Sequence, residues 1–132
     1  MVVGYSEPRG EGFFFLKVSR RPEEVDFEFT RERITDWIAR QVIPRVIADF
    51  SDQESSSLTA VKARALLTQF DRKVQALWPE DKRRLRIALV ARSGSFGQGI
   101  ARMLMGHAYG LQRTDLAQFE AVEAARDWVM SK

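Results

Sequence analysis

Hydrophobic residues recur along this chain with two different spacings. Spacing typical of strands predicts strands in some segments, and spacing of about 3.6 residues predicts helices in others. Residues 85–91 read Leu-Arg-Ile-Ala-Leu-Val-Ala, and so apolar a run is typical of a strand covered on both faces in a parallel sheet. Residues 12–18 are rich in aromatic and β-branched side chains and predict a second strand. Residues 45–50 predict a short strand, and residues 114–119 predict a weaker one at a sheet edge.

The N-terminal part of the chain allows two strand pairings. Residues 25–29 alternate apolar and charged side chains, which predicts a half-buried strand joined to residues 12–18 by a hairpin. A competing pairing sets residues 2–6 against residues 13–18, across a turn that contains Pro8 and two glycines. Residues 1–12 are then either a short extra strand or a flexible lead, and the sequence leaves both pairings open.

Apolar residues at helical spacing predict four helices. The first follows Thr30, interpreted as its N-cap, and ends at Pro44. The second is long, begins near Leu58 behind a polar loop and ends at Pro79. Two more cover residues 96–108, with Gly110 as the C-cap, and residues 121–129.

Strands that alternate with helices predict an α/β fold. We expect one domain over residues 1–132, built as a single mixed, largely parallel sheet of about five strands covered by about four helices. The expected order of elements is β-β-α-β-α-β-α-β-α.

The cysteine and histidine content of the chain excludes several kinds of catalytic and metal-binding site. The chain has no cysteine and one histidine, which excludes thiolate chemistry and sites that need two histidines. Its carboxylates are scattered singly, and His107 lies on the apolar stripe of its helix, so we expect no enzyme activity, metal or cofactor. No apolar run is long enough to cross a membrane and no secretory signal is present, so we expect a cytoplasmic protein.

The positive charge is concentrated in the second half of the chain. Residues 61–132 carry 13 of the 21 basic residues and 7 of the 18 acidic ones, and the densest cluster is at residues 82–86. A nucleic-acid interface would interleave such a cluster with aromatic residues for base stacking. None does so here, and we interpret the cluster as a solvated loop rather than a nucleic-acid site.

Two stretches resemble the STAS domains (sulphate transporter and anti-sigma factor antagonist), particularly the bacterial SpoIIAA-like branch. Residues 46–58 look like that family's strand, polar loop and serine-capped helix, and residues 85–128 look like its last β-α-β-α unit. The resemblance implies the STAS topology. It also implies a phosphate-accepting serine, which the family carries in an Asp-Ser-Ser-Gly stretch; this chain has Glu-Ser-Ser-Ser at residues 54–57.

Two loops are the candidate sites. Ser55, Ser56 and Ser57 precede the long helix, and each is a candidate helix cap or phosphate acceptor. The turn after residues 85–91 is a candidate loop for an anion or a small ligand. Since the carboxyl ends of parallel strands meet at one edge, the two loops should face each other across a shallow crevice. Asp49 and Asp52 would there oppose an anion or pair with an arginine of the turn. The candidate ligand residues of that turn are Arg92, Ser93, Ser95 and Gly97.

These observations and the resemblance together predict a non-catalytic regulatory or protein-interaction module. Its partner is expected to be another protein that contacts the long helix near Ser55, and a homodimer is left open. The alternative is a small-ligand carrier for an anion, a nucleotide or a lipid, with a topology similar to CRAL-TRIO domains. An interior cavity would favour the carrier, whereas an exposed apolar patch on the long helix would favour the interaction module.

Overall fold

A computed structural model describes residues 4–6, 12–40, 44–56, 58–80 and 83–131 of the chain. Its strands form one sheet in the order β1-β2-β3-β4-β5. The last four strands are parallel, and β1 pairs with β2 in the antiparallel sense. The strands are β1 (Gly4–Ser6), β2 (Phe14–Lys17), β3 (Arg45–Asp49), β4 (Leu85–Val90) and β5 (Thr114–Phe119).

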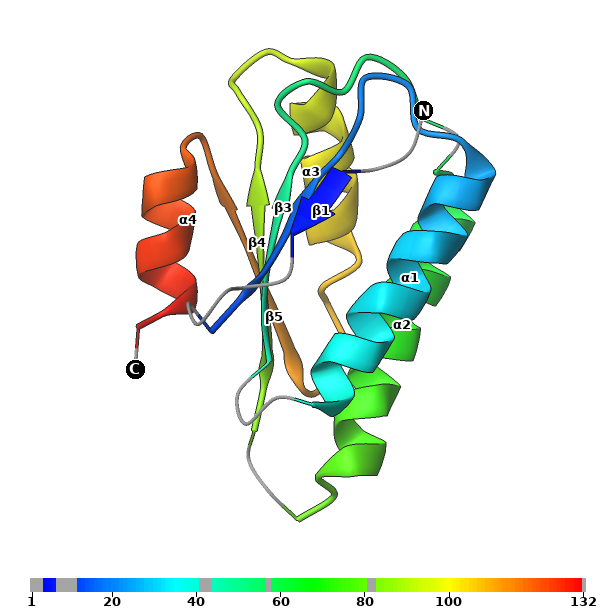
Figure 1. The fold of residues 1–132 in the computed structure, drawn as a ribbon, viewed down its shortest axis with the longest axis vertical. Helices are drawn as coiled ribbons and strands as arrows, with labels where there is room; N and C mark the ends of the chain where they lie inside the picture. Colours follow the sequence, from blue (N-terminus) through cyan, green and yellow to red (C-terminus); the bar gives the residue numbers. More distant parts are fainter. Residues whose placement is uncertain (1–3, 7–11, 41–43, 57, 81–82, 132) are drawn as a thin grey trace.

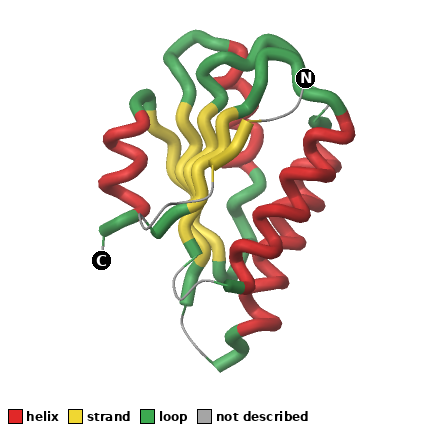
Figure 2. The backbone as a smooth tube through the Cα atoms, in the orientation of Figure 1, coloured by secondary structure: helices red, strands yellow, loops and turns green. Residues whose placement is uncertain are grey.

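In the described part of the chain, four helices cover the two faces of this sheet: α1 (Glu24–Ala39), α2 (Ala60–Leu77), α3 (Phe96–Gly106) and α4 (Val122–Val129). A crossover between two parallel strands of one sheet is almost always right-handed. Because β2 to β5 lie in the sheet in their sequence order, right-handed crossovers place all of their connecting helices on the same face. Figure 1 shows α1, α2 and α3 on one side of the sheet and α4 on the other, and Figure 2 shows the strands as one twisted layer between them. The predicted α/β class, with a largely parallel sheet, is confirmed.

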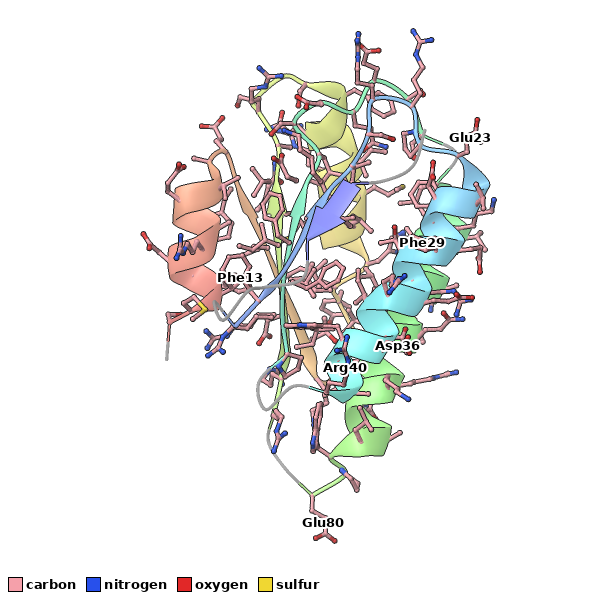
Figure 3. All side chains as sticks on the ribbon, in the orientation of Figure 1. Phe13, Glu23, Phe29, Asp36, Arg40 and Glu80 are labelled. Atoms are coloured by element: carbon pink, nitrogen blue, oxygen red, sulfur yellow. The ribbon has the colours of Figure 1, made fainter. Side chains whose placement is uncertain are left out.

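Each face of the sheet has its own core, because successive side chains of a strand point to opposite faces. Leu85, Ile87 and Leu89 of β4 face the larger cluster under α1, α2 and α3. Ala88 and Val90 face the smaller cluster under α4, which includes Phe13 beside that helix (Figure 3). The prediction that residues 85–91 form a strand covered on both faces is therefore confirmed.

The predicted strand at residues 25–29 is wrong, because these residues belong to α1. The helix begins in a capping box: the Glu23 backbone N–H donates to an Asp26 carboxylate oxygen at 2.7 Å. Thr30 is consequently a buried residue inside α1 and not its N-cap. The competing pairing is the one observed, with Tyr5 opposite Leu16 in the β1–β2 ladder. The turn proposed between those strands lies largely outside the described residues.

Candidate functional site

The carboxyl ends of the parallel strands, together with the loops that leave them, form the candidate site at the upper end of the molecule in Figure 1. The sheet register places Lys17, the last residue of β2, beside Asp49, the last residue of β3. The loop after β3 leads toward α2, and the loop after β4 leads into α3. The predicted meeting of the two loops at one edge of the sheet is therefore observed.

The two aspartates of this edge interact with a lysine and not with Arg92. Lys17 Nζ lies 3.1 Å from an Asp52 carboxylate oxygen and 4.0 Å from one of Asp49. Asp49 is 5% exposed, and its other oxygen accepts hydrogen bonds from the backbone N–H and the hydroxyl of Ser51. These bonds hold the loop in a tight turn at the end of β3. Arg92 instead donates to the Ser51 carbonyl at 3.0 Å.

The residues of the loop after β4 have different roles. Ser95 is the N-cap of α3: its hydroxyl accepts from the Gln98 N–H at 3.1 Å and donates to the Arg92 carbonyl at 2.6 Å. Gly97 is buried, and a Cβ at this position would lie 2.2 Å from the Phe50 carbonyl oxygen. Gly97 is therefore required for close packing of α3 against the end of β3. Ser93 is exposed.

The expectation that one of the three serines caps the long helix is corrected by the structure. The N-cap of α2 is Thr59, whose hydroxyl accepts from the Lys62 N–H at 3.2 Å. Ser56 Oγ accepts from the Leu58 N–H at 2.9 Å and so stabilises the turn before the helix. Ser55 is exposed, and Ser57 lies outside the described residues. The helix starts later than the serine run suggested, so the residue with cap geometry is the threonine.

A second loop, at residues 19–23 after β2, fixes the position of the serine loop. The Arg20 carbonyl accepts from the N–H groups of Glu54 and Ser55 at 2.7 and 3.2 Å. The Arg20 guanidinium also donates to the Glu54 carboxylate at 2.7 Å. This hydrogen bond is the main reason that the pKa of Glu54 lies below its ordinary value and that the pKa of Arg20 lies above its own.

These loops surround an open depression of about 450 Å³, here called the edge depression. Two arginines and two carboxylates lie around it, so its charge is balanced and a simple anion gains little there. Phe96 is 45% exposed at its rim, and the Oε1 atom of buried Gln53 finds no donor among the described residues. Of the predicted ligand residues, Arg92 and Ser95 line the depression, whereas Ser93 and Gly97 do not. The lining residues are Arg20, Ser51, Asp52, Gln53, Glu54, Arg92, Ser95 and Phe96.

A second hollow lies under α1 and α2, and the sequence reasoning missed it. This inner cavity has a volume of about 70 Å³ and is lined by apolar side chains of the sheet and of both helices, together with Thr30 and Arg31. The first turns of α1 form one wall of the inner cavity. Because residues 25–29 were predicted to be a strand, the predicted fold lacked this wall. The signal that could have revealed it is the helical spacing of Phe27, Thr30 and Ile34.

In comparisons with known proteins, no family model, curated protein or solved structure matches this chain. Among the described residues, no three histidine or carboxylate side chains are grouped as a metal site requires. His107 is the C-cap of α3, and its N–H donates to the Leu104 carbonyl. No helix in the described part of the chain combines the length and the apolar character needed to cross a bilayer.

Proposed function

We propose that this protein is a non-catalytic regulatory module, of the type represented by SpoIIAA-like STAS domains, which binds another protein at the edge depression. The observation that carries the proposal is the exposed Phe96, which lies on the depression beside Arg92 and Arg20. Aromatic residues and arginine are enriched where proteins bind one another. Carboxylates on the same rim would orient a partner of complementary charge.

The depression is also held in place before a partner arrives. The Arg20 carbonyl fixes two N–H groups of the serine loop, and Arg92 fixes the Ser51 carbonyl. A preordered loop loses less conformational entropy on binding, which leaves more of the contact energy for affinity.

Regulation by phosphate belongs to the same proposal. Ser55 is the exposed serine beside Glu54, and a phosphate on it would add about two negative charges next to the Arg20–Glu54 pair. The phosphate would compete with the Glu54 carboxylate for the Arg20 guanidinium. It would thereby change the charge and the shape of the edge depression and, with them, the affinity for the partner.

The test is site-specific photo-crosslinking in the native host. A photoreactive phenylalanine analogue at Phe96 should capture one protein, which mass spectrometry then identifies. The same analogue at Tyr109, which is 98% exposed but does not line the depression, is the matched control. With the purified partner, Phe96→Ala and Arg92→Ala should each weaken binding about tenfold, and Tyr109→Ala should not. Equal capture at both positions would overturn the proposal.

The second candidate function, carriage of a small ligand, is favoured by one observation, the inner cavity. Small-molecule sites are typically apolar cavities of about 300–1,000 Å³, so the inner cavity of about 70 Å³ would admit only a few non-hydrogen atoms. A ligand there would lie between the sheet and α1 and α2, apart from the edge depression. The two candidates therefore depend on separate residues.

A further inference from the structure

The outer edge of β5 has no partner strand among the described residues, because β5 is the last strand of the sheet. The helix that follows it, α4, packs back over β4 and β3, where Arg45 and Arg86 bind its C-terminal end. Thr114 is buried, whereas the residues from Asp115 to Phe119 are each partly exposed. This part of β5 is therefore open to a partner on its outer side.

Alternate residues of β5 direct their backbone groups to opposite sides of the strand. The carbonyls of Arg113 and Phe119 accept from N–H groups on the β4 side at 2.8 and 3.0 Å. In a parallel pair every second residue bonds to the same neighbour, so the odd-numbered residues between these two also face β4. The N–H and C=O groups of Leu116 and Gln118 consequently point away from the sheet. Such groups are a template on which another strand can add.

The sequence of β5 lacks the features that protect edge strands from pairing. Proteins commonly blunt such edges with prolines, lysines, bulges or very short strands. The opposite edge strand, β1, is short, covering Gly4–Ser6 among the described residues. By contrast, β5 reads Thr-Asp-Leu-Ala-Gln-Phe and pairs with β4 along its whole length without a bulge. Its one charged residue, Asp115, is held by Arg84 at 2.8 Å. Nothing in this strand therefore opposes the addition of another.

We infer that two copies of this chain pair through β5 in the antiparallel sense, about a twofold axis beside Ala117. Leu116 of each copy then lies opposite Gln118 of the other, and each such pair exchanges two backbone hydrogen bonds. Ala117 meets its own counterpart, and its small side chain permits the close approach of a pair without hydrogen bonds. Asp115 lies opposite Phe119, so this register sets no like charges against each other. The two sheets become one continuous sheet across the axis.

The charges at the two ends of β5 favour a second copy over an unrelated strand. Among the described residues, the partly or fully exposed charges at the N-terminal end have a net positive sum: Arg83, Arg84, Arg113 and Asp115. The Asp71 carboxylate there is buried and accepts from backbone N–H groups. At the C-terminal end, Glu120 and Glu123 are exposed. Antiparallel pairing brings the positive end of each copy beside the negative end of the other, which is electrostatic self-complementarity.

The inference is tested on the whole chain by sedimentation equilibrium and by amide hydrogen exchange. Sedimentation should show a reversible equilibrium between monomer and dimer. The amides of Leu116 and Gln118 should exchange more slowly as the protein concentration rises through the dimer dissociation constant, because only the dimer gives these N–H groups an acceptor. The Ala117 amide is directed at β4 and is the internal control, since its protection should change much less with concentration.

Matched variants separate the strand pair from general damage to the fold. Gln118→Pro removes an N–H that the sheet of a single copy does not use, and proline is tolerated at such edge positions. Because the twofold axis repeats the loss, this variant should weaken the dimer at least about tenfold. Gln118→Ala keeps the N–H and should weaken it less than about threefold. Glu120→Lys should weaken the dimer several-fold, whereas Glu32→Lys, the same charge change on α1, should not. Thermal melting confirms that the variants are folded.

Three other outcomes would each overturn the inference. A chain that stays monomeric at about 1 mM, the range of weak association, does not pair through β5. A dimer in which the Leu116 and Gln118 amides exchange at the same rate at every concentration has its interface elsewhere. Protection of these amides only in a complex with a different protein would assign the outer edge of β5 to a partner's strand. None of these results affects the protein-binding proposal, since that proposal is tested at Phe96.

Discussion

At the scale of single residues, the edge depression is organised by one exposed ion pair that joins two loops distant in sequence. Arg20 contacts Glu54 through its side chain and holds the Glu54 N–H with its carbonyl oxygen. The hydrogen bond from Arg20 lowers the pKa of Glu54. Because the folded-state pKa lies below the unfolded one, the contribution of the pair to stability is present at neutral pH. It is lost as the pH falls through the lowered pKa.

We expect Arg20→Ala to raise the pKa of Glu54 toward its ordinary value near 4.5. Arg21 is the matched control, since its guanidinium lies 3.7 Å from the same carboxylate and contributes less to the shift. Arg21→Ala should therefore move the pKa of Glu54 by a smaller amount. Carboxyl-carbon NMR over an acid titration measures both changes. An unchanged Glu54 titration in Arg20→Ala would show that the pair does not persist in solution.

At the scale of elements, the sequence predicted best those segments whose pattern fits a single period. Residues 85–91 are too apolar for any position but a central strand, and β4 is buried as expected. Residues 25–29 are too few to decide the period, because Phe27 also begins a helical series with Thr30 and Ile34. The outcome there depends on the capping box of Glu23 and Asp26 and on the burial of Asp26 in the first turn of α1. Neither is visible in a local hydropathy pattern.

The sequence predicted where the candidate site lies, at the edge of the sheet, but not which side chains contact one another there. Parallel strands bring the two loops together whatever their side chains are, so the edge of the sheet could be inferred. Which partner Asp49 takes depends on the register that places Lys17 beside it. Which hydroxyl caps α2 depends on backbone angles set by the preceding loop. The strand register therefore makes Lys17, and not Arg92, the partner of Asp49. The backbone before α2 likewise makes Thr59, and not one of the serines, the cap of that helix.

The cap of α2 gives a prediction at this scale. Thr59→Ala should lower the free energy of unfolding by about 0.5–2 kcal/mol, because the Lys62 N–H loses its acceptor. Thr59→Asp should retain most of the stability, since a carboxylate accepts the same bond and suits the helix dipole. Urea denaturation measures both effects. Ser56→Ala, which removes a bond outside the helix, is the comparison and should cost less. A larger loss for Ser56→Ala would place the effective cap in the serine loop.

At the scale of the whole molecule, the two faces of the sheet are covered unequally. Among the described elements, α1, α2 and α3 cover one face and α4 covers the other (Figure 1). Two strand arginines hold the C-terminal end of α4: Arg45 Nε donates to the Val129 carbonyl at 2.6 Å, and Arg86 donates to the Trp128 carbonyl at 3.1 Å. Burial, and then the neighbouring charge of Arg86, lowers the pKa of Arg45. Both cations lie where the helix dipole is negative.

Removal of these contacts should release α4 while the rest of the fold persists. In the double variant Arg45→Ala and Arg86→Ala, three carbonyls at the end of α4 lose their charged donors, and we expect a loss of about 2–4 kcal/mol. Arg84→Ala breaks the exposed Arg84–Asp115 pair of 2.8 Å and should cost at most about 1 kcal/mol.

Hydrogen exchange shows where the stability is lost. Amides of α4 should exchange faster in the double variant, while those of β3 and β4 keep their protection, because local opening of one helix costs less than global unfolding. Uniformly faster exchange would instead mean that the arginines stabilise the whole sheet.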